Sequence, residues 1–164
     1  MRVLVTGGGT GIGAAIADRL HQEGHEPIVC GRRPIQRPGA LVWDVTSDPE
    51  GLIEAAGPLD ALVNNAGHAE HRPVQDWDEA VWTEHFRVHV LAPALLSRAF
   101  ARGRQTGSIV NIASTLADRP VAGTAPYAAA KAGLVAQTRA LALELAPQVR
   151  VNALLVGCVR TAMT

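Results

Sequence analysis

The chain of 164 residues is poor in aromatic side chains, in cysteine and in lysine. Its two cysteines, Cys30 and Cys158, lie far apart and form no CxxC motif, which excludes a disulfide scaffold and predicts two buried free thiols. No apolar run is long enough for a signal peptide or a membrane span, so we expect a soluble, cytoplasmic protein without a membrane partner. The 15 basic and 15 acidic residues cancel, which argues against a surface for nucleic acid.

Short apolar runs alternate with longer helical patterns, and no repeat or linker divides the chain. The length fits a single domain over residues 1–164, and 48% hydrophobic residues are enough for one core. This alternation indicates βαβ units and an α/β fold, a doubly wound parallel sheet of about six strands covered on both faces. The expected strands are residues 3–6, 28–30, 41–43, 61–64, 108–112 and 149–156.

Three helices are expected between these strands. The first covers residues 11–23, with Gly24 as its C-cap. A capping box at residues 76–79 opens the second, which runs to residue 100 with a kink at Pro93. The third covers residues 125–146 and is ended by proline.

The connection between the second and third expected strands is short. Only residues 32–39 form it. A parallel crossover normally needs about a dozen residues or more. The second crossover helix is therefore expected to be missing or reduced to a loop.

A glycine-rich run follows the first expected strand. Gly7, Gly11 and Gly13 have the spacing G-x-x-x-G-x-G. Glycine lets the backbone turn tightly and approach a phosphate, and the helix that follows directs free N–H groups at the anion. Between a strand and a helix, the run predicts a dinucleotide-binding loop, the other interpretation being a flexible glycine turn.

The residues after the second strand bear on which dinucleotide is bound. An acidic side chain there would bind the ribose 2′-hydroxyl of NAD, but Gly31 occupies the position and Arg32 and Arg33 follow it. A guanidinium suits a 2′-phosphate, so these residues favour NADP (NADPH) over NAD. The other interpretation is a solvated arginine pair on a loop.

The only tyrosine and the only lysine, Tyr127 and Lys131, are four residues apart near the start of the third expected helix. This spacing places both side chains on one helix face. A free tyrosine has a pKa of about 10, and a neighbouring cation is expected to lower that pKa towards neutral pH. Tyr127 can then protonate a carbonyl oxygen as hydride arrives at carbon, or deprotonate an alcohol in the reverse direction.

Together these motifs resemble those of the short-chain dehydrogenase/reductase family, over residues 2–164. Residues 6–13 resemble the family's TGxxxGIG, residues 64–67 its NNAG, residues 44–45 its adenine-contacting pair, and residues 107–114 the strand that ends in its catalytic serine. Ser114 precedes Tyr127 by 13 residues, a spacing typical of ketoacyl-carrier-protein reductases.

The resemblance implies a Rossmann fold and assigns roles by position. Tyr127 would be the acid/base, Lys131 would hold the nicotinamide ribose and tune Tyr127, and Ser114 would hydrogen-bond the substrate oxygen. Besides Tyr127 and Lys131, the implied cofactor-binding residues are Thr6, Gly7, Gly9, Thr10, Gly11, Ile12, Gly13, Arg32, Arg33, Asp44, Val45, Asn65, Ala66, Gly67, Gly157 and Thr161.

Three features depart from the family pattern. His89 stands where the family has an asparagine that anchors a water of the proton relay, and it is a catalytic candidate that either replaces this asparagine or alters the relay. Val156 precedes Gly157 where the family has proline, which loosens the turn at the nicotinamide. The sequence ends at Thr164, before the family's substrate-covering segment and seventh strand, so it is either partial or a minimal form with an open site.

We therefore expect an NADP-dependent oxidoreductase that transfers hydride between nicotinamide and a small-molecule carbonyl or alcohol. The alternative is a catalytically weak or inactive nucleotide-binding module with a regulatory or assembly role. His89 and residues 145–152 resemble pterin-reducing members, so a pterin is also a candidate substrate, with ketoacyl compounds and small ketones as the runner-up.

Two further expectations concern metals and assembly. His68, His71, His85 and His89 have no carboxylate or thiolate at a typical ligand spacing, so no metal site is expected. Family members form dimers or tetramers through two helices of each subunit. The alanine-rich helix over residues 125–146 allows this packing, or else it faces the sheet.

Overall fold

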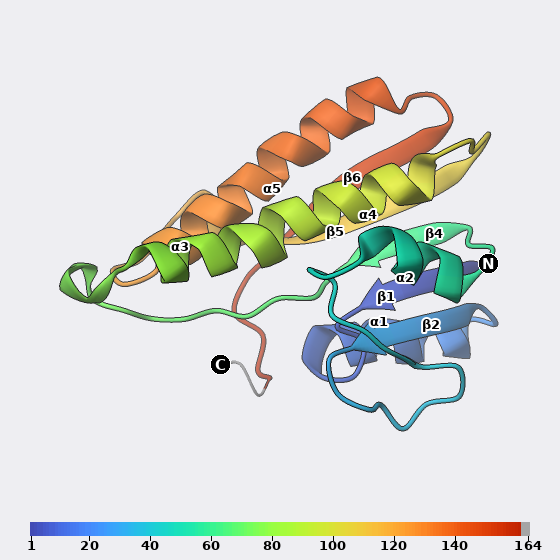
Figure 1. Ribbon diagram of the computed structural model, residues 1–164, viewed down its shortest axis with the longest axis horizontal. Helices are drawn as coiled ribbons and strands as arrows, with labels where there is room; N and C mark the ends of the chain where they lie inside the picture. The colour runs from blue at the N-terminus through green and yellow to red at the C-terminus, as the bar shows by residue number, and fades with distance from the viewer. Residues whose placement is uncertain (162–164) are drawn as a thin grey trace.

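The computed structural model describes residues 1–161 and contains one parallel sheet with helices on both faces (Figure 1). Its strands are β1 (Arg2–Thr6), β2 (Glu26–Gly31), β3 (Leu41–Val42), β4 (Ala61–Asn64), β5 (Gly107–Ser114) and β6 (Val149–Val156). Their order is β3-β2-β1-β4-β5-β6, and all pairings are parallel. This is the expected doubly wound Rossmann arrangement of six strands.

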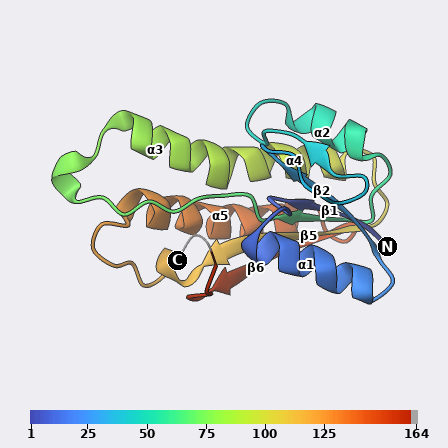
Figure 2. The ribbon, with the colours of Figure 1, turned by 90° about the horizontal axis from the view of Figure 1, so that it is seen from below.

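Side chains of the central strands alternate between two core clusters. Leu4 packs with the cluster under α2 (Pro49–Ala56), α4 (Ala92–Ala101) and α5 (Ala125–Glu144). Val3 and Val5 pack with the cluster under α1 (Gly11–Gln22), on the opposite side of the sheet (Figure 2). The sheet is not covered on both faces at the end of β6, where Leu154 is 54% exposed. The helix on that face, α1, packs on β1 and β2 instead.

The crossovers on either side of β3 differ from each other. Residues 32–40 join β2 to β3 without a helix, which confirms the reduced second crossover. The next crossover contains α2, which the sequence patterns did not predict. The Asp48 carboxylate accepts the N–H of Gly51 at 2.9 Å, and Pro49 occupies the first turn. An aspartate followed by proline is a helix-start signal that could have revealed α2.

The helical stretch before β5 begins later than expected. The Asp78 carboxylate accepts the N–H of Val81 at 2.9 Å and caps α3 (Glu79–Phe86). Asp76 instead ends the short 3-10 helix η1 (Val74–Asp76). The prediction of a capping box at residues 76–79 is therefore wrong, because the cap lies two residues further along the chain.

The kink expected at Pro93 takes the form of a π turn, η2 (Arg87–Leu91), directly before α4. Proline has no N–H to give to the preceding turn, so the helix widens there. Gln137 of α5 bridges the break. In the orientation that satisfies both groups, its amide donates to the carbonyl of Val90 at 3.1 Å and accepts the N–H of Ala94 at 3.0 Å.

The carboxyl ends of the strands share one edge of the sheet, and α3 projects beyond that edge (Figure 1). Cys30 is buried in β2, but Cys158 is exposed where the chain leaves β6. The prediction of two buried thiols is therefore wrong for Cys158, because the sheet ends before it. Within residues 1–161, no helix combines the length and apolar character needed to cross a membrane.

Candidate active site

A cleft of about 580 Å³ opens at the carboxyl edge of the sheet. The ends of β1, β4, β5 and β6 and the first turns of α5 contribute to its walls. The predicted site residues that line it are Gly7, Thr10, Gly11, Ile12, Asn65, Ala66, Gly67, His89, Ser114, Tyr127, Lys131, Gly157 and Thr161. The glycine loop and the Tyr-Lys pair therefore face one cleft.

A side-chain clamp holds the glycine loop against the segment after β4. The Thr6 hydroxyl accepts the N–H groups of Asn65 at 2.9 Å and of Ala66 at 3.0 Å. In return, the Asn65 amide donates to the Thr6 carbonyl at 2.9 Å. A Cβ atom at Gly13 would overlap the carbonyl oxygen of Gly7 and the Asn65 amide. Thr6, Asn65 and Gly13 thus shape the loop.

The start of α1 directs its backbone into the cleft. Gly7 and Gly11 have positive φ values of 64° and 53°, which side chains with a Cβ rarely adopt. The N-cap residue Thr10 makes no side-chain bond to the first turn, so the leading N–H groups remain open to an anion. Gly9 lies at the outer side, where its Cβ position faces Ile35.

The residues predicted at the adenosine end lie outside this cleft. Arg32 and Arg33 are exposed after β2. The Asp44 carboxylate accepts hydrogen bonds from the N–H of Thr46 at 2.9 Å and from its hydroxyl at 2.8 Å. These bonds, and more weakly the charge of Arg32, hold the pKa of Asp44 below its usual value. The Asp44 carboxylate therefore stays ionised.

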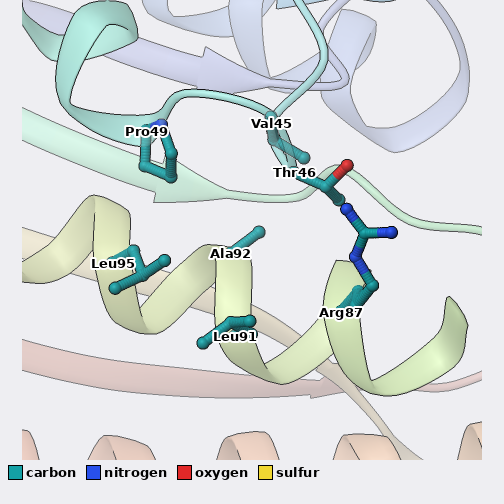
Figure 3. A pocket seen from close by; sticks show the side chains of 7 residues that line it. All are labelled: Val45, Thr46, Pro49, Arg87, Leu91, Ala92 and Leu95. Atoms are coloured by element: carbon teal, nitrogen blue, oxygen red, sulfur yellow. The ribbon is translucent and has the colours of Figure 1, made fainter. Parts of the chain in front are cut away.

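Val45 is buried and faces α4 across a small cavity (Figure 3). Arg87 extends from the π turn towards Thr46 on the rim of the same cavity (Figure 3). The cavity measures about 20 Å³, which is room for a single water molecule. The cavity lies between α4 and the residues that follow Asp44, and it is too small for a ligand.

Ser114, Tyr127 and Lys131 meet where β5 ends and α5 begins. The Ser114 hydroxyl accepts the N–H of Leu116 at 3.1 Å and is hydrogen-bonded to Tyr127. Lys131 is 5% exposed, and its Nζ donates to the carbonyl of Ile112 at 2.6 Å. The same Nζ lies 5.7 Å from the centroid of the Tyr127 ring.

The pKa values of this group differ from the expectation. Burial raises the pKa of Tyr127, and the hydrogen bond with Ser114 lowers it by less. Burial also lowers the pKa of Lys131 to about 8. The expected lowering of the Tyr127 pKa by Lys131 is wrong for this arrangement, because the ammonium is directed at Ile112 and is itself poorly solvated.

His89 lies beside these residues and is 2% exposed. Its Nε2 is 2.8 Å from the carbonyl of His68, so Nε2 carries the proton and donates it. Its ring stands edge-on to Tyr127, at 89° and 5.2 Å between centroids. Burial, and then the charge of Lys131, lower the pKa of His89 to about 2. His89 is therefore neutral at working pH and cannot carry a proton as an imidazolium.

This neutral state predicts acid sensitivity that depends on His89. As the pH falls from about 6.5, the unfolded chain binds a proton at His89 that the folded chain does not bind. The free energy of unfolding of wild type therefore falls, relative to that of His89→Asn, by up to about 1.4 kcal/mol per pH unit. Urea unfolding of both proteins between pH 4.5 and 7.5 measures this difference, with His21→Asn on the exposed side of α1 as the control. Parallel curves for wild type and His89→Asn would contradict the prediction.

The sequence analysis assigned no site role to two of the histidines near Tyr127. His68 lines the cleft, and His85 is 1% exposed on α3. The i,i+4 spacing of His85 and His89 places both rings on one helix face and is the signal that could have indicated them. Within residues 1–161, no group of three or more histidine, cysteine or acidic side chains is arranged to hold a metal ion.

Comparison with known proteins adds to this geometry. A family model described as short chain dehydrogenase matches residues 1–164. Dehydrogenase/reductase SDR family member 4 of Homo sapiens is 34% identical over 98% of this chain and 66% of its own length.

Two solved structures resemble the chain closely. The 3-ketoacyl-(acyl-carrier-protein) reductase from Brucella melitensis, complexed with NADH, is 30% identical with a TM-score of 0.88, over 99% of this chain and 77% of that one. FolM alternative dihydrofolate reductase 1 from Brucella canis, complexed with NADP, is 32% identical with a TM-score of 0.85, over 95% of this chain and 72% of that one. Both matches cover most of each solved chain, so the likeness extends over the whole fold.

Proposed function

Because the chain belongs to the short chain dehydrogenase family, whose members are NAD(P)-dependent oxidoreductases, we propose that it uses NADP and reduces a carbonyl group with Tyr127 as the acid. The observation that carries this proposal is the single cleft that joins the glycine loop to Ser114, Tyr127 and Lys131. A loop for a pyrophosphate and a proton donor share one space, as hydride transfer to a carbonyl requires.

The residues present fit a dinucleotide. A Cβ at Gly7 would lie 2.9 Å from the Cα of Ala66, so only glycine allows the loop after β1 to pack this closely against the segment after β4. The start of α1 would hold the pyrophosphate, Lys131 the nicotinamide ribose, and Arg32 a 2′-phosphate on the adenosine ribose. When bound, the nicotinamide supplies the hydride.

The chain's own residues then supply the proton and the alignment. The Tyr127 hydroxyl donates its proton to the carbonyl oxygen as negative charge develops there. The Ser114 hydroxyl donates a hydrogen bond to the same oxygen, and the buried Lys131 ammonium, held by the Ile112 carbonyl, would position the nicotinamide ribose. His89 takes no proton and instead holds the carbonyl of His68, which fixes the cleft wall that follows β4.

A catalytically silent nucleotide-binding module is the second candidate. The raised pKa of Tyr127 is the observation that favours it, because a more weakly acidic phenol is a poorer proton donor. A regulatory or assembly role would require nucleotide binding by the glycine loop but would not require the hydroxyl of Tyr127. Removal of that hydroxyl therefore discriminates between the two functions.

The similar structures support two substrate classes for this cleft. One similar protein is a dihydrofolate reductase complexed with NADP, which supports a pterin ring. Another is a ketoacyl reductase, which supports a ketone on a flexible chain. A pterin would be reduced at a ring C=N bond, with the proton of Tyr127 passing to the ring nitrogen instead of a carbonyl oxygen. We place the pterin first, because His89 and the half-buried His68 give the cleft a polar wall.

We also propose that the protein is cytoplasmic and forms a homodimer or homotetramer through α5. Ala128 and Leu134 are buried, whereas Ala132 and Ala136 are small, exposed side chains four residues apart on one face of the helix. Leu143 at the end of this helix is 83% exposed. Small side chains permit close helix packing across a two-fold axis. A monomer by light scattering at micromolar concentration would contradict an obligate oligomer.

Calorimetric titration with NADPH and NADH tests the proposed cofactor. We expect NADPH to bind more tightly, and Arg32→Ala to lose about tenfold in NADPH affinity with little change for NADH, because one charge-assisted bond is removed. Arg119→Ala, at a side chain that is 90% exposed, is the matched control. Binding of NADH in preference would overturn the role of Arg32, and binding of neither dinucleotide would overturn the proposed function.

A further inference from the structure

Three imidazoles gather beside Tyr127, and the mechanism uses only His89. The ring centroids of His68 and His85 are 4.7 Å apart, and those of His68 and His89 are 5.6 Å apart. His85 stands edge-on to Tyr127, at 81° and 6.2 Å. The cluster joins the segment after β4 to α3 and η2 at the mouth of the cleft.

Two of the three imidazoles have their tautomers fixed by backbone carbonyls. The Nδ1 of His85 is 2.8 Å from the carbonyl of Val81, so Nδ1 carries the proton and Nε2 is an acceptor. His89 donates from Nε2 to the carbonyl of His68, so its Nδ1 is an acceptor. Both acceptor nitrogens are buried without a partner within residues 1–161. A buried acceptor without a donor is costly, so a donor brought to either nitrogen would be bound favourably.

His68 differs from the other two because its ring reaches the cleft. It is half-buried and lines the cleft together with Ser114 and Tyr127. Its bond to His89 uses the backbone carbonyl, which leaves the ring free to meet a bound molecule. The His68 and His85 ring centroids lie 4.7 Å apart, so a turn of the His68 ring would bring an N–H to the unpartnered Nε2 of His85 and leave the second ring nitrogen, with its lone pair, for the cleft.

We propose that His68 is a specificity-determining residue whose ring, oriented by His85, accepts a hydrogen bond from a hydroxyl or ring N–H that the substrate carries next to its reducible carbonyl. This inference rests on the proposed carbonyl reduction and names its substrate class. The substrate is a polar carbonyl compound with a hydrogen-bond donor beside the reacting carbon, such as an α-hydroxyketone or an N–H-bearing ring, and not a plain aliphatic ketone.

The charges around His68 agree with an acceptor role. Burial is the main cause that lowers the pKa of His68, followed by His85, while Glu84 and Glu70 act in the opposite direction and Arg32 lowers it slightly. A lowered pKa keeps the ring neutral, with a free lone pair. Glu70 also lines the cleft, in an ion pair with Arg72 at 2.7 Å, and it adds a second acceptor to the same wall.

Two matched ketones test the proposal with the full chain and NADPH. Cyclohexanone and 2-hydroxycyclohexanone share a ring and differ in one donor hydroxyl. We expect wild type to prefer the hydroxylated ketone by about tenfold in kcat/KM, the worth of one hydrogen bond. His68→Phe keeps a ring against its neighbours and is expected to abolish this preference, so that the kcat/KM ratio of the two ketones falls to about one. His68→Gln, which retains an acceptor, is expected to restore part of it.

Two further variants distinguish the contribution of His68 from that of other histidines. His85→Phe is expected to reduce the preference through loss of orientation, and His21→Phe on α1 is expected to keep it. Imidazole nitrogen NMR gives a readout independent of activity, in which His85 shows a proton on Nδ1 and His89 a proton on Nε2. The opposite tautomer at His85 would overturn its orienting role.

The outcomes also separate the inference from the proposed function. If wild type reduces both ketones and His68→Phe slows them equally, the inference is overturned and the proposed function stands. If His68→Phe alters only the KM for NADPH, the ring serves the cofactor and the inference is likewise overturned. If wild type reduces neither ketone, the inference is overturned, while the titration with NADPH tests the proposed function separately.

Discussion

Tyr127→Phe is expected to lower kcat for carbonyl reduction by about a thousandfold, because the proton donor is removed from the transition state. The affinity for NADPH is expected to stay within about twofold of wild type, since the glycine loop is untouched. The ring contact with His89, at 5.2 Å between centroids, persists in phenylalanine, so the fold is retained. Oxidation of NADPH at saturating substrate and calorimetric binding measure the two quantities.

Ser114→Ala provides the graded comparison for this variant. Its hydroxyl contributes a hydrogen bond and not the proton itself, so a loss of about a hundredfold is expected. Carbonyl reduction by Tyr127→Phe at the wild-type rate would show that Tyr127 is not the acid. Equal and undetectable turnover in wild type and variant, with NADPH bound in both, would favour the silent nucleotide-binding module.

The parts of this molecule that sequence predicted are those set by neighbouring residues. The strands, the glycine loop at residues 6–13 and the missing second crossover helix follow from apolar runs, glycine spacing and the short link after β2. The Tyr127–Lys131 pair follows from helical spacing within a single element. Each of these depends on residues only a few positions apart in the chain.

What sequence missed depends on contacts between distant segments. The clamp between Thr6 and Asn65 joins residues 59 positions apart. The bridge from Gln137 to the π turn depends on how α5 crosses that turn. The meeting of His68 with His85 depends on where α3 begins, which the sequence placed two residues too early.

The direction of the shift in the Tyr127 pKa also depends on contacts that spacing along the chain does not contain. Sequence spacing places Lys131 on the correct helix face but says nothing of where its ammonium is directed. In the fold that ammonium bonds to the carbonyl of Ile112, and burial acts on both side chains. Proximity along a helix therefore predicted the partners but not the sign of their electrostatic effect.

Lys131→Arg is expected to be nearly as damaging as Lys131→Met, with a loss of about a hundredfold in kcat for each. Lysine presents a compact ammonium, and here it lies in a site that is 5% exposed, 2.6 Å from the Ile112 carbonyl. The planar guanidinium is larger and needs more hydrogen-bond acceptors than this site offers. Arginine occupies 14 of the 15 basic positions of the chain. The one lysine therefore indicates a position that requires an ammonium group and not a guanidinium.

The two variants also differ from wild type in how stability depends on pH. Burial lowers the pKa of Lys131 to about 8 in the folded chain from 10.5, so the cost of the buried charge is fully present below pH 8. As the pH rises from about 8 to about 10.5, the unfolded chain holds this proton more tightly, and wild type gains stability relative to Lys131→Met. Urea unfolding across this window measures the gain, with Arg139→Met on the exposed side of α5 as the matched control. A wild-type curve parallel to that of Lys131→Met would show that Lys131 is solvated in the folded protein, and full turnover by Lys131→Arg would show that charge alone is what the site requires.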